Sequence, residues 1–548
     1  MLRQYQQEAS DAVVRELEDN VSTLVVLPTG TGKTVLFADV VRRFQPRRCL
    51  VFAHREELVF QAKDKIEKFA GVHCEVEMGQ FKSDGWFGAR PPCVVSSVQT
   101  LASGGDGGGR MTKFDPSEFG LVVVDEAHHA TSGTYRKVME YFKEGGCKIL
   151  GVTATPDRAD EEALGQVFDT VAYDYEIVQA IDDGWLVPVV QKMVNVSSLD
   201  LSACRTTAGD LNGADLAKVM EDEETLHGVA IASVETCGER RAIVFAATVK
   251  QAERLAEIFN RYKAGSATWI CGETNKDDRR KLLRDFAGGS YQFMVNVGVL
   301  TEGFDDSGVE VIVMARPTKS RALYAQMAGR GTRPADSIAA ALSDMRTTEE
   351  RRAAIANSRK PFCEILDFAG NSGRHKLVNA VDILGGKVSD EAVEMARKKI
   401  RESNGPVNVQ EVLKEMEETK REMDERKARE AAMRDKIRAK ASFSTVDVDP
   451  FDVFHIQPVK ARGWDHAKTL SDKQRDILLR QGIDPDGMPY GQARQLLNEV
   501  FRRWNLKLSS FKQARILRKN GVTAPMRHEE ASRMIDAIAQ RNGWRRHA

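Results

Sequence analysis

The sequence predicts an α/β protein in which two parallel sheets are followed by a charged helical spacer and a small helical domain. Up to about residue 385, short continuous runs of Val, Ile and Leu alternate with amphipathic stretches of helical period. Continuous apolar strands separated by helices are typical of parallel sheets that are covered on both faces. The polar stretch 197–224 interrupts this alternation, so we expect two α/β domains rather than one large sheet.

Eight apolar runs are the expected strands. They are residues 23–27, 49–53, 93–96, 121–124 and 148–152 in the first half, and 242–246, 292–297 and 309–315 in the second half. A Gly-rich stretch at 103–109 is expected to form a surface loop. A segment rich in Ala, Arg and Glu at 335–360 predicts a helical insertion before a further strand at 362–366.

The chain after residue 386 has a different composition. Residues 390–441 are rich in Glu, Lys, Arg, Met and Ala, and their candidate heptad seam is polar in the middle, so a solvated spacer helix is favoured over a stable coiled coil. In the last segment, Lys473-Gln474 recurs 39 residues later as Lys512-Gln513, which predicts two helix-turn-helix-like units. We therefore expect four domains, at residues 1–180, 181–386, 387–460 and 461–548.

Charge and hydropathy limit the classes of protein. The 548 residues carry 80 Lys and Arg against 80 Asp and Glu, which excludes a uniformly basic coat for nucleic acid and an acidic solvating tail. The balance is uneven, because residues 501–548 carry twelve Lys or Arg against three acids. We find no apolar stretch of membrane-spanning length and no apolar signal segment at the start, so we expect no membrane association and a cytoplasmic protein.

The eight cysteines are scattered singly, with no C-x-x-C pair and no paired His spacing. In a chain of this length they predict reduced, mostly buried thiols, a cytosolic compartment and no zinc site. His73-Cys74 is the nearest approach to a ligand pair, and without a second pair it is expected to be structural.

A phosphate-binding loop is the strongest functional signal. Between the apolar run that ends at Leu27 and an expected helix that starts at Val35, it comprises Pro28, Thr29, Gly30, Thr31, Gly32, Lys33 and Thr34. Glycines let backbone amides close around phosphates, Lys33 reaches the β- and γ-phosphates, and Thr34 offers a hydroxyl to Mg²⁺. Leu27 stands where the general pattern has its first glycine. The strand-loop-helix context still predicts that the chain binds ATP or GTP.

Two adjacent carboxylates follow another expected strand. Asp125 and Glu126 come directly after the apolar run 121–124. Asp125 is expected to hold Mg²⁺, and Glu126 is expected to orient and deprotonate the attacking water. Together with the phosphate loop, the pair indicates hydrolysis of the nucleotide rather than binding alone.

Arginines in the second half supply the complementary charge. Arg330 and Arg333 are three residues apart, a spacing that on a helix places both on one face, from which they would reach the γ-phosphate across a cleft. Taken alone, the segment is equally well interpreted as a solvated basic turn. A site with contributions from both halves would be complete only when the domains close, which is how nucleotide binding becomes motion.

The phosphate loop, the carboxylate pair and the two arginines follow one another along the chain in the order of the motifs of superfamily 2 helicases and translocases. The chain resembles this superfamily over about residues 1–385. Asp125-Glu126-Ala127-His128 resembles the family's motif II, and Thr153-Ala154-Thr155-Pro156 resembles the motif that couples hydrolysis to the grip on nucleic acid. The resemblance implies two tandem RecA-like domains that use ATP and Mg²⁺, with hydrolysis stimulated by nucleic acid.

The resemblance also implies roles for single residues. Base contacts are implied for Arg3 and Gln6, and a further ATP contact is implied for Gln326. The catalytic residues it implies are Lys33, Thr34, Asp125, Glu126, Arg330 and Arg333. The coupling residues it implies are His128, Thr153, Thr155, Gly303 and Asp305. The nucleic-acid contacts it implies, each of which alone would be an ordinary cap or surface residue, are His54, Arg55, Gln61, Gln99, Thr100, Thr274 and Thr301.

Within the superfamily, several segments resemble the branch of RadD-like proteins, UvsW-like phage helicases and restriction motors. They are Arg3-Gln4-Tyr5-Gln6, His54-Arg55-Glu56, Gly303-Phe304-Asp305 and Gly329-Arg330-Gly331-Thr332-Arg333. The cysteine-rich segment of RadD-like proteins is absent. We therefore expect an ATP-dependent DNA helicase or translocase, with an RNA helicase as the less favoured interpretation. The alternatives are a motor subunit of a nuclease or defence complex, and a nucleic-acid clamp that ATP switches.

The basic C-terminal segment has two interpretations. Trp504 and Trp544 lie among the basic residues of 501–548, a combination that binds phosphates and stacks on bases. The alternative is a helical module whose tryptophans belong to its core and which docks on a partner protein.

Overall fold

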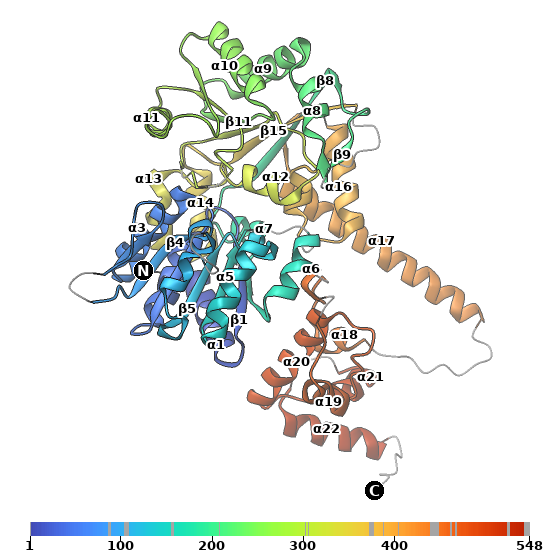
Figure 1. The fold of residues 1–548 in the computed structure, drawn as a ribbon. Coiled ribbons are helices and arrows are strands. Elements are labelled where there is room, and N and C mark those ends of the chain that lie inside the picture. The colour runs from blue at the N-terminus through green and yellow to red at the C-terminus, as the bar shows by residue number, and fades with distance from the viewer. Residues whose placement is uncertain are drawn as a thin grey trace. The chain divides into compact units, whose positions relative to one another are not determined.

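The computed structural model divides the chain into two compact units, whose elements are labelled in Figure 1. One unit comprises Met1–Asp157 and Phe168–Asp424, and the other comprises Arg158–Val167 and Glu425–Ala548. The structure describes residues 2–541 except 86–88, 104–108, 155–157, 208, 302, 305, 372–376, 387, 404, 439–448, 461–462, 466–467 and 523–525. Across these described ranges, no helix has the length and apolarity that a membrane span requires. The four domain boundaries stay predictions.

The first unit contains two seven-stranded sheets, which confirms the predicted α/β class. The first sheet has the order β3-β4-β2-β5-β6-β1-β7, and all its neighbouring strands are parallel. Its strands are β1 Ser22–Val26, β2 Arg48–Ala53, β3 Cys74–Glu77, β4 Cys93–Ser97, β5 Phe119–Asp125, β6 Lys148–Thr153 and β7 Thr170–Asp174. The sequence missed β3 and β7, because both contain charged residues and neither is a continuous apolar run.

Helices bury both faces of the first sheet. They are α1 Gln4–Asp19, α2 Lys33–Arg43, α3 Glu56–Ala70, α4 Val98–Ala102, α5 Gly133–Glu144 and α7 Ile177–Asp182, with short 3-10 turns η1 Arg110–Lys113, η2 Pro116–Glu118 and η3 Ala127–Thr131. Leu121 and Val123 of β5 share an apolar core with α1, α2 and α3. On the other face, Phe52 of β2 contacts Tyr135 of α5, with ring centroids 5.6 Å apart. Since the strands are parallel, the loops after them meet at one edge, where such sheets bind ligands.

The second sheet has the order β12-β13-β11-β14-β15-β8-β16. Its strands are parallel except for β16, which pairs antiparallel with β8. They are β8 Val189–Asp200, β11 Ala242–Phe245, β12 Ala267–Ile270, β13 Phe293–Asn296, β14 Val311–Met314, β15 Cys363–Asn371 and β16 Val407–Asn408. The sequence missed β8, whose alternation of buried and more exposed residues hides it from a search for continuous apolar runs.

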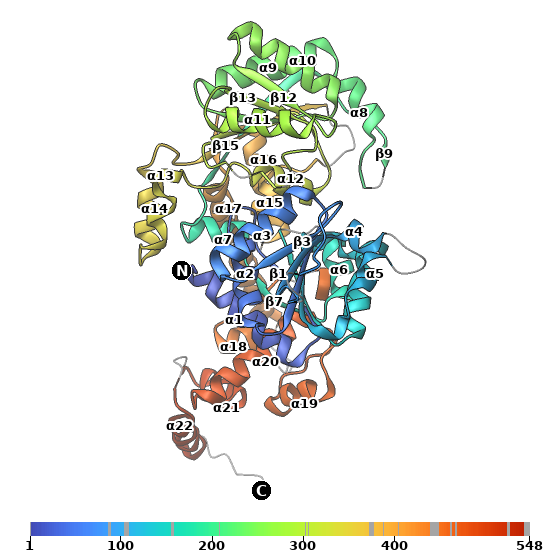
Figure 2. The ribbon, with the colours of Figure 1, turned by 60° about the vertical axis from the view of Figure 1, so that its left-hand side comes forward.

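Two groups of helices sandwich the second sheet. Ala242 and Val244 of β11 share a core with α9 and α10, whereas Ile243 and Phe245 share a core with α11 and α12. These helices can be followed in Figure 2. The expected insertion at 335–360 is helical, as predicted. The helices and minor strands of this half are α8 Gly213–Met220, α9 Glu223–Cys237, α10 Val249–Tyr262, α11 Lys276–Ala287, α12 Arg321–Ala328, α13 Asp336–Ala339, η4 Ala341–Ser343, α14 Thr348–Ala356, α15 Ala380–Leu384, α16 Asp390–Glu402, β9 Thr206–Thr207 and β10 Asp210–Leu211.

The helical prediction for the rest of the chain is confirmed. The longest helix of the expected spacer is α17 Val409–Arg438, and its residues 421–427 are all exposed. Four helices in two consecutive pairs form the expected repeat units: α19 Asp472–Gln481, α20 Tyr490–Asn505, α21 Phe511–Lys519 and α22 His528–Arg541. The short helix α18 Pro450–Phe454 packs with them around an apolar core.

The C-terminal unit also holds the helix that lies between β6 and β7 in the sequence. This helix, α6 Arg158–Val167, packs against the turn η5 Gly463–Asp465. The carboxylate of Glu161 accepts a hydrogen bond from the amide of Gly463 at 2.6 Å. A Cβ on Gly165 would lie 2.7 Å from the Cα of Trp464, so only glycine allows this close approach.

All eight cysteines are buried and none is in a disulfide, as predicted for reduced thiols. The compartment inferred from them stays a prediction. The Gly-rich loop expected at 103–109 falls largely on 104–108, outside the described residues.

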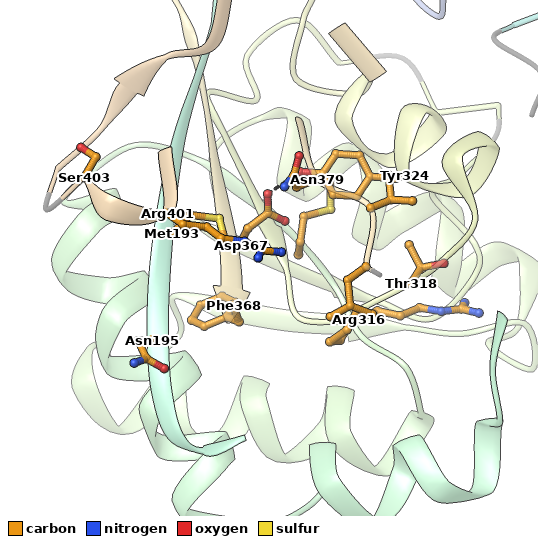
Figure 3. Close-up of a pocket in the computed structure, with 14 residues that line it drawn as sticks. Met193, Asn195, Arg316, Thr318, Tyr324, Asp367, Phe368, Asn379, Arg401 and Ser403 are labelled. Atoms are coloured by element: carbon orange, nitrogen blue, oxygen red, sulfur yellow. Dashed lines mark hydrogen bonds between the residues drawn. The ribbon is translucent and has the colours of Figure 1, made fainter. Parts of the chain in front are cut away.

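A cavity of about 550 Å³ lies beside the carboxyl end of β14 and the middle of β15 (Figure 3). Asp367 of β15 lies in its wall, and Oδ2 of Asp367 accepts hydrogen bonds from the Tyr324 hydroxyl and the Gln191 amide, both at 2.5 Å. Burial disfavours the carboxylate and raises the pKa of Asp367 to about 7. Asp367 is therefore largely protonated in the folded protein below neutral pH.

Asp367→Asn should remove a pH dependence of stability. The folded-state pKa of Asp367 lies above the ordinary value of 3.8, so the folded protein binds the extra proton and loses stability as pH rises from about 4 to about 7. Because one pKa unit corresponds to about 1.4 kcal/mol, the wild type should lose a few kcal/mol that Asp367→Asn does not lose. Urea unfolding at several pH values measures this difference, with the exposed Asp277→Asn as control. Equal losses in wild type and Asp367→Asn would contradict it.

Candidate functional site

The phosphate loop adopts a conformation that requires glycine at two positions. The φ angles are 90° at Gly30 and 82° at Gly32, and α2 begins directly after Gly32. A Cβ on Gly32 would lie 2.6 Å from the side-chain amide nitrogen of Gln6. The hydroxyl of Thr31 donates to the carbonyl of Pro28 at 2.7 Å. The loop therefore leads into the N-terminus of α2, where backbone N–H groups and the helix dipole favour phosphate.

The structure brings the lysine of this loop to the carboxylates that follow β5. Nζ of Lys33 lies 3.3 Å from Oε1 of Glu126, and both side chains are largely buried. The amide of Glu126 donates to Oδ1 of Asp125 at 3.0 Å. Glu126 has a φ of 48°, in the left-handed region that is costly for a residue with a Cβ. Such strain is typical of functional turns, and here it places two carboxylates side by side.

The environment of Asp125 suits a divalent cation. Burial, together with the negative charge of Glu126, raises the pKa of Asp125 to about 6. A bound cation would reverse this effect, because positive charge favours the carboxylate. The carboxylate of Asp125 and the hydroxyl of Thr34 are oxygen donors of the kind that Mg²⁺ prefers. The residues present therefore fit Mg²⁺.

Histidines and a threonine extend the carboxylate pair. Nδ1 of His128 lies 3.5 Å from Oε2 of Glu126 and 3.2 Å from Oγ1 of Thr153. The ring centroid of His129 lies 4.1 Å from that of His128 and 4.7 Å from that of His54. His54, expected at the nucleic acid, thus lies beside the candidate hydrolytic site. His129 was not predicted from the sequence, although this residue follows His128 directly.

The first turn of α1 is fastened to the phosphate loop. The hydroxyl of Tyr5 donates to the carbonyl of Thr31 at 2.5 Å, and the amide of Gln6 donates to the same carbonyl at 2.9 Å. The guanidinium of Arg3 lies 4.7 Å from the ring centroid of Trp185. This ring also lies 4.4 Å from the guanidinium of Arg351, on the inserted helix α14. Roles for Tyr5, Trp185 and Arg351 were not predicted from the sequence, because two of them come from distant segments without a motif.

The two arginines expected on one helix face do not lie on a helix. Helix α12 ends at Ala328, and Arg330 and Arg333 lie in the turn that follows it. After α12 the amides of Arg330 and Gly331 donate to carbonyls only three residues back, those of Met327 and Ala328, a tightening that a spacing rule based on residue number does not detect. Gln326, expected at the nucleotide, is a buried residue of α12.

The two arginines face different loops. The guanidinium of Arg330 donates to the carbonyls of Thr301 at 2.6 Å and Phe304 at 2.7 Å. Arg333 lies against the phosphate loop, since a Cβ on Gly30 would lie 3.1 Å from its Cγ. Burial lowers the pKa of Arg333 to about 10, which leaves it charged at neutral pH. Arg333 is therefore the arginine at the phosphate loop in this structure.

Two of the residues expected at nucleic acid join the two sheets. The guanidinium of Arg55 donates to the carbonyls of Gly298 and Val299, each at 3.3 Å. The amide of Gln61 on α3 donates to the carbonyl of Gly303 at 2.6 Å. These residues line a cavity of about 530 Å³ between α3 and the loop after β13.

The other expected contacts lie in local turns. The amide of Thr100 in α4 donates to the hydroxyl of Ser97, the residue that caps this helix, and the neighbouring Gln99 is exposed. The hydroxyl of Thr274 accepts a hydrogen bond from the amide of Cys271 at 3.0 Å. Thr301 is buried. Thr155 and Asp305, expected to couple hydrolysis to nucleic acid, lie outside the described residues.

Two protein-family models match the chain. "Type III restriction enzyme, res subunit" matches residues 1–158, and "Helicase conserved C-terminal domain" matches residues 227–335. The first match contains the phosphate loop and the carboxylate pair, and the second contains both arginines.

Known proteins also resemble much of the chain. The candidate ATP-dependent helicase IRC3 of Saccharomyces cerevisiae is 30% identical over 71% of this chain and 54% of its own length. An endonuclease subunit of the type I restriction enzyme EcoAI from Escherichia coli is 24% identical over 60% of this chain and 44% of its own length. The chain thus spans about half the length of these relatives.

A solved structure shares the fold. The ATP-dependent type ISP restriction-modification enzyme LlaBIII, solved bound to DNA, matches 74% of this chain and 31% of its own chain with a TM-score of 0.50 and 16% identity. At this identity the match shows the fold alone.

Gly329→Ala should weaken nucleotide binding. A Cβ at this position would lie 2.7 Å from Cβ of Thr29, so the methyl group should push the turn after α12 away from the phosphate loop. Overpacking of this kind costs about 1–3 kcal/mol, and we expect about tenfold weaker binding of a fluorescent ATP analogue. Gly272→Ala is the matched control, because a Cβ there meets no atom within 4 Å. Unchanged affinity in Gly329→Ala would show that the contact does not support the site.

Proposed function

Since the chain belongs to superfamily 2 of the helicases, we propose that it is an ATP-dependent helicase or translocase that acts on DNA. Its two sheets are the tandem RecA-like domains of this superfamily, whose members hydrolyse ATP. The family supports nucleic-acid-dependent motor activity, and the choice of DNA is the finer part of the proposal.

One observation carries the proposal. The phosphate loop of the first sheet is in contact with the turn after α12 in the second half, where Arg333 lies against Gly30 and Gly329 lies against Thr29. A nucleotide bound at this loop would therefore contact residues from both halves of the first unit. Hydrolysis at a site of this kind changes the contacts that hold the two sheets together, which supports a motor more than a simple hydrolase.

The positions of the residues suggest how ATP would be hydrolysed. Lys33 would bind the β- and γ-phosphates, and Glu126, oriented by Lys33 and His128, would align the attacking water and accept its proton. Thr34 and Asp125 would hold Mg²⁺, which neutralises charge on the phosphates when bound. Arg333 would stabilise charge on the γ-phosphate, and Arg330 would pass the state of the site to the loop 301–304.

Two features support DNA as the substrate. Two of the similar proteins are restriction enzymes by name, and one of these, LlaBIII, was solved bound to DNA. The segments around Arg3, His54, Gly303 and Arg330 resemble the DNA-directed branch of the superfamily. The family match to a restriction subunit also favours a second candidate function, a motor subunit of a nuclease or defence complex.

Hydrolysis of ATP should depend on both the site residues and the polymer. We expect single-stranded, forked or duplex DNA to stimulate hydrolysis more than RNA of equal length does. Lys33→Ala should remove phosphate binding, and Glu126→Gln should retain ATP binding but lower the rate about 100-fold or more, because positioned proton transfer contributes at least this much. Phosphate release measured with each polymer tests these expectations.

Lys137→Ala, at an exposed lysine of α5, is the control for the loss of one positive charge and should match the wild type. Equal stimulation by RNA would overturn the choice of DNA. Hydrolysis that survives Lys33→Ala would overturn the motor assignment.

A further inference from the structure

Two aromatic rings stand on the surface of α20 in the C-terminal unit. Phe501 is 38% exposed and Trp504 is 47% exposed, and their ring centroids lie 5.4 Å apart with an angle of 72° between the ring planes. Leu506, directly after the helix, is 55% exposed. Large apolar side chains that adjoin one another on a surface are typical of binding sites rather than of ordinary solvent-facing helices. The interpretation that Trp504 belongs to the core is therefore wrong, and Trp544 lies outside the described residues.

The core of this unit is complete without the two rings. Helix α20 supplies Ala493, Leu496, Leu497 and Val500 to it. Arg503, next to Trp504, is buried and donates to the carbonyl of Ser509 at 2.8 Å and to its hydroxyl at 2.9 Å. These bonds fix the end of α20. The rings are thus presented by a rigid element, which lowers the entropy lost when a ligand binds.

Exposed basic residues follow the rings along the chain. Lys507 and Arg527 are both exposed, and an antiparallel bridge between Leu508 and Arg527 places their segments next to each other. The carbonyl of Lys507 accepts a hydrogen bond from the amide of His528 at 2.9 Å. Among the described residues, neither Lys507 nor Arg527 forms an ion pair, whereas Arg502 and Arg503 both pair with Glu499. The described range 501–541 carries ten Lys or Arg against three acids.

This combination fits unpaired nucleotides. Aromatic rings stack on bases of any sequence, and nearby cations bind the backbone phosphates. Rings inclined by 72° do not both stack on the parallel bases of an intact duplex. Bases of a single strand turn independently, so they suit such a pair of rings.

We propose that Phe501, Trp504, Leu506, Lys507 and Arg527 form a second DNA-binding surface that holds unpaired nucleotides of the substrate. We refer to these five residues as the α20 surface. The proposal rests on the proposed function, because it takes DNA as the polymer on which the motor acts. It adds a contact that lies outside both sheets and outside every helicase motif.

Trp504→Ala in the full chain should weaken binding to a labelled single-stranded oligothymidylate by about tenfold, because one stacked base contributes roughly this factor. Fluorescence anisotropy without nucleotide measures the affinity. Lys507→Ala should weaken binding and lower the slope of log affinity against log salt by about 1, whereas Trp504→Ala should leave the slope unchanged. Trp504→Phe keeps a ring and should retain most of the affinity. Leu479→Ala, at another exposed apolar residue of the same unit, should match the wild type.

The proposal is overturned if Trp504→Ala and Phe501→Ala both bind the oligonucleotide as tightly as Leu479→Ala does. That result would assign the α20 surface to a protein partner. The two proposals fail separately. DNA-stimulated ATP hydrolysis by the wild type and by Leu479→Ala reports on the motor, whereas the affinity of Trp504→Ala for the oligonucleotide, measured without nucleotide, reports on the α20 surface even in a chain that does not hydrolyse ATP.

Discussion

The contact between the phosphate loop and the turn after α12 is the constraint on which the rest of the structure depends. Gly329 lies so close to Thr29 that a methyl group would not fit, and Arg333 lies against Gly30. Two positive charges are expected to act on the γ-phosphate, and they come from different halves of the first unit: Lys33 from α2 and Arg333 from the turn after α12. A nucleotide at the phosphate loop must then bind with a different free energy in conformations that keep this contact and in conformations that break it. A motor requires such a difference in binding free energy.

The same turn also reaches the loops expected to hold the polymer. Arg330 donates to the carbonyls of Thr301 and Phe304, and Gln61 of α3 donates to Gly303 between them. Since Arg330 and Arg333 are three residues apart in one short turn, movement of this turn at the phosphate loop alters the hydrogen bonds around Gly303. The structure thus contains a short physical connection, made of hydrogen bonds and packing, between the phosphate loop and the loop around Gly303 that is expected to contact the polymer.

The sequence predicts those parts of the site that are encoded locally. The phosphate loop and Asp125-Glu126 follow apolar runs directly, so both the strands and the residues at their ends are legible from spacing. The prediction that Arg330 and Arg333 share one helix face is wrong, because α12 ends at Ala328 and the spacing rule assumes that the helix continues. Trp185 and Arg351 were missed because their contact with each other depends on the packing of distant segments. The sequence leaves two interpretations of Trp504 open, because the pattern of a basic amphipathic helix does not show which of its aromatic rings are buried by neighbouring helices.

Movement along DNA tests the central claim most directly. A third strand bound to duplex DNA as a triplex, or streptavidin bound to a biotinylated end, reports on a protein that travels along the polymer without requiring strand separation. We predict that the wild type displaces such a block when ATP is hydrolysed and does not displace it with a non-hydrolysable analogue. DNA-stimulated hydrolysis without displacement of any block would contradict the account and would identify the chain as a clamp whose affinity ATP switches.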